Sequence, residues 1–372
     1  MRRRTHIRVG LSISLTGKYS LQGRQVLDGV RAWSAYVDSQ GGLAVGSDPP
    51  LPIRIHYLDD ESRVDVARQN AIQLLEKDRV HALLGPYSSG ITLVVADVAE
   101  QRSRILWNHG GNSDAIYTRG LRSIVGIGSL ASEYLRALPA LLAQTAPAQR
   151  RICLLHSSAG TFAQQVSRGL QTEAARLGVH SVELLPVASP VERLDLVVSQ
   201  LRDFSPDILV LASDFEDETN ILRTRPIWPD CIQTVVAVAA GVHTFGAHLG
   251  GLAEEVIGPS QWEAGYEFSD CLGPTPNWFA AQFKERFGKL PEYTAAAAFA
   301  TGLIFSECVR RAGSLEDRRL RDAASELDCC TMFGRFRIES RTGCQMGHRC
   351  LLVRWRQGKK VMLDAAGNEH PV

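Results

Sequence analysis

Two adjacent serines lie where a small anion could bind. Residues 85–90 have the sequence Gly-Pro-Tyr-Ser-Ser-Gly and follow the apolar segment 80–84, directly before a predicted helix. The free N–H groups of a helix N-terminus attract anions, and Ser88 and Ser89 add hydroxyl donors, so a carboxylate is a natural ligand. Serine is also a favoured helix cap, and a plain cap is the alternative interpretation.

A second polar and aromatic stretch follows the next predicted strand. Residues 107–113 contain Trp107, whose ring could form a pocket wall, the small residue Gly111 and the hydroxyl of Ser113. Ligands of open α/β sheets gather at the carboxyl ends of the strands, which is where both stretches are expected. The alternative is a loop that ends the strand and buries its tryptophan.

Acidic and aromatic residues supply further candidates. Residues 214–218 are Asp-Phe-Glu-Asp-Glu and follow another predicted strand. Such a run is usually a solvated helix start, where carboxylates favour the dipole, but one of its members could contact a ligand. Asp214 and Phe215 are the candidates. Three other aromatic residues could line a pocket, although core packing explains each equally well: Tyr19, Phe162 and Trp262.

Signatures of enzymes and metal sites are weak. Residues 126–131 fit G-x-G-x-x-A, but the acidic residue expected about 20 positions later is missing. No G-x-x-x-x-G-K-S/T, G-x-S-x-G or H-E-x-x-H motif occurs. The spacings of His243 and His248, and of the cysteines and the histidine in residues 329–350, match no common zinc pattern; free thiols or one disulfide explain these cysteines. We expect no catalysis, no cofactor and no metal.

Composition narrows the class of protein. Hydrophobic residues are 45% and charged residues 22%, and 41 Lys+Arg against 40 Asp+Glu leave a net charge of +1, with no general attraction for nucleic acid. No apolar run approaches the about 18 residues of a membrane span, so we expect a water-soluble protein. Residues 1–4 resemble the start of a secretory signal without its apolar stretch. A cytosolic protein and a start inside a longer precursor both remain open.

The elements that position the candidate residues form two series. The chain of 372 residues is longer than the about 250–300 at which single cores stop growing. Short apolar strands alternate with amphipathic helices, first from residue 5 and again from residue 151, which predicts parallel sheets covered on both faces. The first strand of each series ends in Ser-x-x-Gly-x-aromatic: Ser14, Gly17 and Tyr19, then Ser157, Gly160 and Phe162.

Several short stretches together resemble the type I periplasmic binding proteins, in particular the branched-chain (hydrophobic) amino-acid receptors of ABC transporters. The resemblance covers nearly the whole chain and rests on residues 15–23, 41–43, 84–90, 206–210, 293–296 and 342–345. It implies an α/β fold of two Rossmann-like parallel-sheet lobes, joined by a three-strand hinge and closing over a small ligand in the cleft. Lobe 1 would comprise residues 1–127 and 260–334, and lobe 2 residues 128–259 and 335–372.

The resemblance also assigns roles to particular residues. Ser89 would hold the ligand carboxylate with help from Ser113 and the backbone of Gly111, and Phe162 would pack on the ligand. Amino-acid receptors of this family commonly carry a Glu where this chain has Ala240, so the ligand ammonium would lack its usual partner. Either Asp214 substitutes or the ligand lacks an amine. The complete set of ligand-binding candidates is Tyr19, Gln22, Ser88, Ser89, Trp107, Gly111, Ser113, Phe162, Asp214, Phe215 and Trp262.

We therefore expect the substrate-binding protein of an ABC transporter. It would bind a small carboxylate, either an amino acid or a deamino aromatic or aliphatic acid, and present it to a membrane permease from the periplasm. It would not span the membrane or bind nucleic acid. The alternative is a cytosolic ligand sensor of the same fold that regulates a partner protein.

Overall fold

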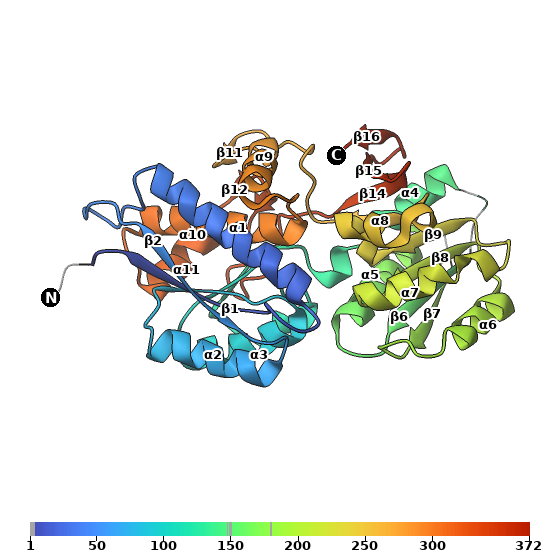
Figure 1. The fold of residues 1–372 in the computed structure, drawn as a ribbon, viewed down its shortest axis with the longest axis horizontal. Coiled ribbons are helices and arrows are strands. Elements are labelled where there is room, and N and C mark those ends of the chain that lie inside the picture. The colour runs from blue at the N-terminus through green and yellow to red at the C-terminus, as the bar shows by residue number, and fades with distance from the viewer. Residues whose placement is uncertain (1–3, 147, 149–150, 179–180) are drawn as a thin grey trace. The chain divides into compact units, whose positions relative to one another are not determined.

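The chain forms two compact units. A computed structural model describes residues 4–146, 148, 151–178 and 181–372. Unit 1 comprises Met1–Ser129 and Tyr266–His348, and unit 2 comprises Leu130–Gly265 and Arg349–Val372, so the chain passes between them three times. Each unit contains its own sheet and helices (Figure 1).

Three segments group differently from the sequence-based division: residues 128–129 and 260–265 at two boundaries, and the longer segment 335–348. Residues 335–348, expected in the second lobe, lie in unit 1. The reason is hydrogen bonding at the edge of its sheet: the Gly126 N–H donates to the Gly343 carbonyl at 2.8 Å, and the Gln345 side-chain amide donates to the Ile127 carbonyl at 2.9 Å.

Unit 1 is built on a five-stranded sheet in which all neighbours are parallel, in the order β2-β1-β3-β4-β5. Its strands are β1 (Ile7–Ile13), β2 (Ile53–Asp59), β3 (Ala82–Leu84), β4 (Leu106–Asn108) and β5 (Ile124–Gly126). Its helices are α1 (Ser20–Ser39), α2 (Val64–Glu76), α3 (Ser89–Gln101), η1 (Asp114–Ile116), α9 (Pro276–Phe287), α10 (Tyr293–Ala312) and α11 (Asp317–Glu326). α2 and α3 pack together on one face of the sheet, and α1 and α10 pack together on the other (Figure 1). A small separate sheet contains β11 (Cys271–Leu272), β12 (Cys329–Thr331) and β13 (Gly334–Phe336).

Unit 2 is built on an eight-stranded sheet in the order β16-β15-β14-β10-β9-β8-β6-β7. Neighbours are parallel from β7 to β10 and antiparallel from β10 to β16. Its strands are β6 (Arg151–Ser157), β7 (Ser181–Val187), β8 (Ile208–Ala212), β9 (Thr234–Ala237), β10 (Ile257–Ser260), β14 (Leu351–Arg356), β15 (Lys359–Leu363) and β16 (Glu369–Pro371). Its helices are η2 (Ala131–Glu133), α4 (Leu138–Thr145), α5 (Phe162–Leu177), α6 (Leu194–Phe204), α7 (Phe215–Arg223), η3 (Arg225–Ile227), η4 (Val238–Gly241), α8 (His243–Leu249) and η5 (Gly250–Ala253).

The apolar strands predicted from the sequence are buried on both faces. β8 has the sequence Ile-Leu-Val-Leu-Ala and is buried along its whole length. Leu209 and Leu211 pack into one hydrophobic cluster, whereas Ile208 and Val210 pack into another. Side chains alternate between the faces of a strand, so helices must cover both sides of this sheet. The α/β fold class is confirmed.

The glycine of the repeated Ser-x-x-Gly-x-aromatic motif has nearly the same φ angle in both units. Gly17 has φ 75° and Gly160 has φ 73°, a left-handed conformation that costs glycine little. Each glycine lets the chain turn from a strand into a helix. Tyr19 then lies at the N-cap of α1, and Phe162 begins α5.

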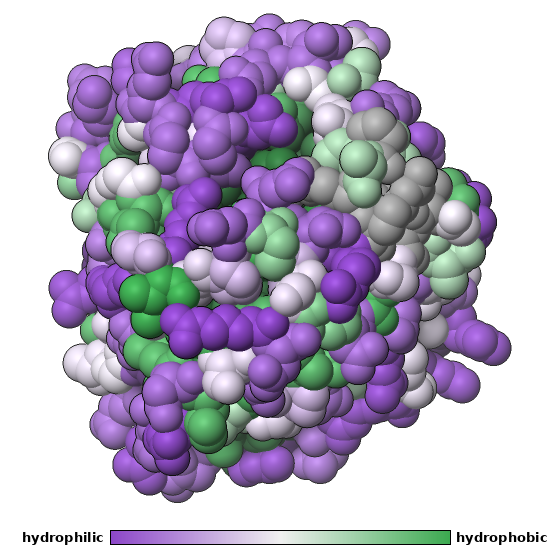
Figure 2. All heavy atoms as spheres, turned by 90° about the vertical axis from the view of Figure 1, so that its right-hand side faces the viewer, coloured by the Kyte–Doolittle hydropathy of each residue, from purple (hydrophilic) through white to green (hydrophobic). Residues whose placement is uncertain are grey.

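The exposed surface is mixed in character. Figure 2 shows one face on which hydrophilic side chains predominate and hydrophobic side chains occur in scattered groups. Among the described residues, no helix combines the length and apolar character that crossing a membrane requires.

Candidate ligand-binding site

The loops after β3 and β4 lie side by side at the carboxyl edge of the unit 1 sheet. β3 and β4 are neighbouring parallel strands, and an isolated bridge continues the pairing between Tyr87 and Gly110. Across this junction the Ser113 N–H donates to the Ser89 Oγ at 3.0 Å. The two serines expected to act together are therefore brought together.

Ser89 retains a donor for a ligand. Its side chain is partly exposed at the first residue of α3, and its Oγ accepts the bond from Ser113. Among the described residues no acceptor takes the Ser89 O–H. This hydroxyl can therefore donate to a bound anion without breaking an existing bond.

Ser88 caps α3 from a strained backbone conformation. Its Oγ accepts a hydrogen bond from the Ile91 N–H at 3.4 Å. Its φ of 77° and ψ of 143° lie in a region that residues other than glycine rarely occupy. Thr92 holds it there, since both the N–H and the hydroxyl of Thr92 donate to the Ser88 carbonyl, at 3.0 and 2.8 Å. Such strain is concentrated at functional sites, where the surrounding structure maintains it.

Asn108 fixes the loop after β4. Its amide group donates to the Gly111 carbonyl at 2.7 Å, and its side-chain oxygen accepts from the Gly111 N–H at 2.9 Å. A Cβ on Gly111 would lie 2.4 Å from the Thr92 Oγ1, so only glycine fits. The loop is therefore shaped by its own residues before any ligand arrives.

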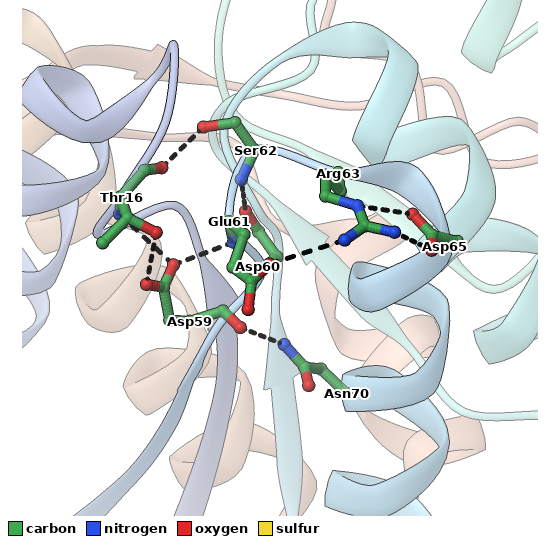
Figure 3. A network of polar contacts seen from close by, with 8 residues as sticks. All are labelled: Thr16, Asp59, Asp60, Glu61, Ser62, Arg63, Asp65 and Asn70. Carbon is green, nitrogen blue, oxygen red and sulfur yellow. Dashed lines mark hydrogen bonds and ion pairs between the residues drawn. The ribbon is translucent and has the colours of Figure 1, made fainter.

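A network of carboxylates and hydroxyls shapes the loop that precedes Tyr19 (Figure 3). The Asp59 Oδ1 accepts the N–H groups of Leu15 and Thr16 at 2.9 and 3.3 Å, and its Oδ2 accepts the Thr16 hydroxyl at 2.8 Å. The Ser62 Oγ donates to the Thr16 carbonyl at 2.8 Å and accepts the Tyr19 N–H at 3.0 Å. This network joins the loop after β2 to the loop after β1.

The network positions an aromatic ring next to the serine loop. The ring of Tyr19 packs edge-on against Tyr87, with centroids 5.7 Å apart, and the hydroxyls of Tyr87 and Tyr293 lie 3.4 Å apart. Tyr87 and Tyr293 were not among the candidates from the sequence, although both lie in stretches that carry the family resemblance. Their position directly beside the serines and at the start of a helix is the signal that could have identified them.

Unit 1 contains buried polar atoms without partners. Five buried side-chain atoms of the described residues have no hydrogen-bond partner: Gln22 Oε1, Trp107 Nε1, His109 Nδ1, His109 Nε2 and Thr294 Oγ1. All belong to unit 1. Because buried polar groups are nearly always paired, each such atom needs an explanation, and a ligand or a water molecule would supply one.

Trp107 is a core residue in this structure. Its side chain is 0% exposed, and its ring packs edge-on against Phe305 of α10, with centroids 5.5 Å apart. The alternative of a buried tryptophan at the strand end therefore describes its position.

His109 is the polar residue that sequence reasoning missed. It directly follows β4 and is 1% exposed. Burial lowers the pKa of the His109 ring to about 4, and the backbone of Gly85 partly offsets this lowering. Neither ring nitrogen has a partner in hydrogen-bond geometry. At neutral pH the ring is uncharged and offers one donor and one acceptor. The residue lies inside the stretch 107–113, so its place after the strand was the available signal.

The carboxylates at the matching edge of unit 2 are used internally. The Glu218 Oε1 accepts the Ser213 N–H at 2.8 Å, and its Oε2 accepts the Ala239 N–H at 2.7 Å. Glu218 is fully buried, and burial raises its pKa to about 8. Asp217 is also buried and accepts the Ser189 hydroxyl at 2.6 Å and the Val191 N–H at 2.8 Å.

The other unit 2 candidates lie at the starts of helices or after strands. Asp214 precedes α7, and its Oδ2 lies 3.2 Å from the Ser189 Oγ, whose proton is directed to Asp217 in the shorter contact. Phe215 begins α7, and its ring packs against His248 with centroids 5.0 Å apart. Trp262 follows β10 and is 4% exposed.

Phe162 packs edge-on against Tyr134, with centroids 5.1 Å apart. The Tyr134 hydroxyl accepts a hydrogen bond from the Gln261 side-chain amide at 2.7 Å. Tyr134, which is fixed by this hydrogen bond, therefore positions the ring of Phe162 at the start of α5.

The described residues contain no group of three or more His, Cys, Asp or Glu side chains that could hold a metal ion. In the cysteine-rich segment, the His348 Nδ1 bonds to the Ser129 Oγ at 2.7 Å and its Nε2 to the Phe333 carbonyl at 3.0 Å. Both ring nitrogens are thus already occupied by protein partners.

Comparison with known proteins places this geometry in a family. The chain matches the periplasmic binding protein family over residues 6–360. It is similar in structure to a leucine-binding protein from Thermotoga maritima, with 16% identity, 96% of this chain and 97% of the other covered, and a TM-score of 0.82. An ABC transporter solute-binding protein from R. palustris in complex with benzoate has 15% identity, coverage of 99% and 98%, and a TM-score of 0.80. A branched-chain amino-acid transporter substrate-binding protein from Streptococcus pneumoniae in complex with isoleucine has 14% identity, coverage of 98% and 99%, and a TM-score of 0.79.

Proposed function

This chain belongs to the periplasmic binding protein family, a family of non-enzymatic receptors, and we propose that it is an ABC transporter solute-binding protein for a small organic carboxylate. The observation that carries the carboxylate proposal is the partly exposed Ser89 hydroxyl, which has its Oγ held by Ser113 and its proton available. It lies at the first residue of α3, where the helix dipole also favours a negative charge.

Neutral donors are sufficient for this task. Hydrogen bonds to a charged group contribute about 1.5–3 kcal/mol each, so two or three of them support specific binding without an arginine or a lysine. We propose Ser89 as the anchor, with Ser113 and the Gly111 backbone beside it. The Gly111 N–H would exchange its bond to the Asn108 side-chain oxygen for one to the ligand. Tyr19, Gln22 and Ser88 complete the proposed unit 1 contacts, and the unpartnered Gln22 Oε1 supports the inclusion of that residue.

We propose further that the ligand lacks an ammonium group. Ala240 occupies the position of the usual carboxylate and is fully buried. Glu218 and Asp217 satisfy backbone and side-chain donors of unit 2, so neither is available to neutralise an ammonium without breaking those bonds. Leaving a buried ammonium unpaired costs several kcal/mol. Relatives of this fold include complexes with benzoate and with 3,4-dihydroxybenzoic acid, which are aromatic acids without an amine.

The remaining parts of the proposal concern unit 2 and the partner. Phe162, Asp214, Phe215 and Trp262 are proposed ligand contacts, with Phe162 packing on the apolar part of the ligand. The resemblance predicts that residues of both units form one site, and this remains a prediction. We also propose a periplasmic location and a membrane permease as the partner that receives the ligand. No chemical step is involved, because ligand binding only shifts the balance between conformations.

A ligand screen followed by one substitution tests the proposal. Thermal shift over aromatic acids, aliphatic acids, keto acids, amides and amino acids should identify a stabilising carboxylate. Calorimetry should then show that Ser89→Ala weakens that carboxylate about 10- to 100-fold, because a hydrogen bond to the anion is lost. The matched control is Ser39→Ala at the exposed end of α1, with unchanged affinity expected. Equal affinity in Ser89→Ala and the wild type would refute the anchor.

A further inference from the structure

Two cysteines face each other in the small sheet of unit 1. All eight cysteines lie within the described residues and are free thiols. Cys271 of β11 and Cys330 of β12 are directly paired in a parallel register. Both are partly exposed. No other pair of cysteines is in register between strands of the described residues.

The register satisfies the geometric requirement for a disulfide. Neighbouring strands lie about 4.7–4.9 Å apart, which falls inside the about 4.4–6.8 Å range of Cα separations in disulfides. Paired residues of adjacent strands point to the same face, so the two Cβ atoms lie next to each other. We propose that Cys271 and Cys330 form a disulfide when the protein meets a thiol oxidant.

The neighbouring Cys329 does not compete for the same partner. Successive side chains of a strand point to opposite faces, so Cys329 points away from Cys271. It interacts electrostatically with Cys308 of α10 on that other face. Burial raises the pKa of Cys329 and of Cys308 to about 12, which keeps both as unreactive thiols at neutral pH.

The strand register places a basic residue beside Cys330, and burial distinguishes the two thiols. Arg335 of β13 is the register partner of Cys330 on the other side of β12 and interacts with it electrostatically. The same guanidinium is paired with the carboxylate of Asp328, at 2.8 and 2.6 Å. The thiolate is the attacking species in thiol–disulfide exchange. Burial raises the pKa of the Cys271 thiol and makes it the poorer nucleophile. Cys330 is therefore the expected first nucleophile and Cys271 the resolving thiol.

The step balances with a small-molecule disulfide such as oxidised glutathione as oxidant. The Cys330 thiolate attacks one sulfur of the oxidant, forms a mixed disulfide and releases one small thiolate. The Cys271 thiolate then attacks the Cys330 sulfur and releases the second. In total the two cysteines lose two protons and two electrons, and the oxidant becomes two small thiols.

The bond would restrain the part of unit 1 that is connected to unit 2. β11 begins five residues after the chain enters unit 1 at Tyr266, and β12 and β13 precede the last passage at His348. A disulfide between them closes a loop of about 60 residues, and long closed loops lose the most entropy in the unfolded chain. The bond should therefore stabilise unit 1, and it does not depend on the ligand assignment.

Oxidation of the purified full-length chain tests the inference. After equilibration with oxidised glutathione, alkylation and peptide mapping should show the Cys271–Cys330 link, and the melting temperature should rise by about 5–15 °C relative to the protein kept in dithiothreitol. Cys271→Ser and Cys330→Ser should each abolish both changes.

Cys329→Ser is the matched control, because it alters the adjacent residue on the opposite face. It should keep both the link and the increase in melting temperature. Thiols that stay free at full equilibration, or a link that involves Cys329 in the wild type and disappears in Cys329→Ser, would overturn the inference. Ser89→Ala should form the link normally, which separates failure here from failure of the proposed ligand site.

Discussion

The carboxyl edges of the two sheets use their polar groups in opposite ways. In unit 1, the edge presents the Ser89 hydroxyl, and the unit contains the five described buried polar atoms without partners. In unit 2, Asp217 and Glu218 are buried and bonded to N–H and hydroxyl groups of their own unit. The unit 1 edge has a hydroxyl donor that no described residue uses, whereas the unit 2 edge uses its carboxyl groups for hydrogen bonds within the unit.

This difference in polar groups bears on the proposed ligand. Under the proposed function, a carboxylate would gain hydrogen bonds from the unit 1 edge, whereas the acidic side chains of residues 214–218 in unit 2 are not donors for an anion. A repeated fold motif, with Gly17 and Gly160 in matching conformations, thus leads to two chemically different edges. The fold sets the positions, and the residue types decide what those positions do.

The largest effect should come from Glu218→Gln. Glu218 accepts hydrogen bonds from two N–H groups, and the NH2 of a glutamine would face one of them. The free energy of unfolding should therefore fall by about 1–3 kcal/mol. The dependence of the unfolding free energy on pH should change as well. The pKa of Glu218 is about 8 in the fold and near its ordinary value in the unfolded chain, so the fold binds more protons and wild-type stability falls as pH rises from about 4.5 to 8.

Urea unfolding at several pH values checks this prediction. Glutamine does not titrate, so the fall in stability between pH 5 and pH 8 should be smaller in Glu218→Gln than in the wild type. Identical slopes would mean that Glu218 is ionised in the fold, and the contrast between the two edges would then rest on hydrogen bonding alone.

A smaller and opposite dependence on pH should come from His109 in unit 1. Its pKa is about 4 in the fold and about 6.5 when unfolded, so the unfolded chain binds more protons and stability is lost as pH falls from 6.5 towards 4. His109→Gln should remove up to about 3 kcal/mol of this acid sensitivity. The dependence on pH that remains is expected from His81 and His243, whose pKa values burial also lowers, to about 4 and about 3. Acid unfolding followed by circular dichroism would show no change if His109 were solvated.

Asp214→Asn distinguishes the two ligand classes. If the ligand lacks an ammonium, the affinity of the carboxylate found by screening should change by less than about threefold, since no ion pair is lost. The α-amino analogue of the same acid should bind weakly to both proteins. Calorimetry that showed tight binding of the amino analogue to the wild type, and a loss of tenfold or more in Asp214→Asn, would instead assign Asp214 to the ammonium.

The smallest effect should come from Trp107→Phe. The ring is packed in the core against Phe305, and the substitution removes a buried N–H without a partner together with some apolar contact. Affinity should stay within about twofold and stability within about 1.5 kcal/mol of the wild type, because the volume changes little. A tenfold loss of affinity with normal folding would place the tryptophan against the ligand.

Most of the fold could be predicted from local sequence patterns. Short apolar strands between helices predicted the parallel sheets, and the two Ser-x-x-Gly-x-aromatic motifs predicted the matched turns, because these features depend on nearby residues. Residues 335–348 were harder, since their place in unit 1 depends on hydrogen bonds to residues more than 200 positions earlier, such as Gln345 to Ile127.

The part of the candidate site that lies directly after strand ends could be predicted from the sequence. The junction of Ser89 and Ser113 follows from the order of β3 and β4. The burial of Trp107 was one of two interpretations that the sequence left open, and the burial of Glu218 was not predicted, because tertiary packing decides whether such a side chain meets solvent. His109 lay inside a stretch that was already identified, and only its burial without partners distinguishes it.

The backbone at Ser88 has a consequence for any attempt to make this protein more robust. Glycine would adopt φ 77° with less strain and would lose only a few tenths of a kcal/mol as a helix cap, so laboratory selection for heat resistance alone should replace this serine. The replacement would free the loop to sample other shapes. Engineering for durability and engineering for affinity are therefore expected to diverge at this residue.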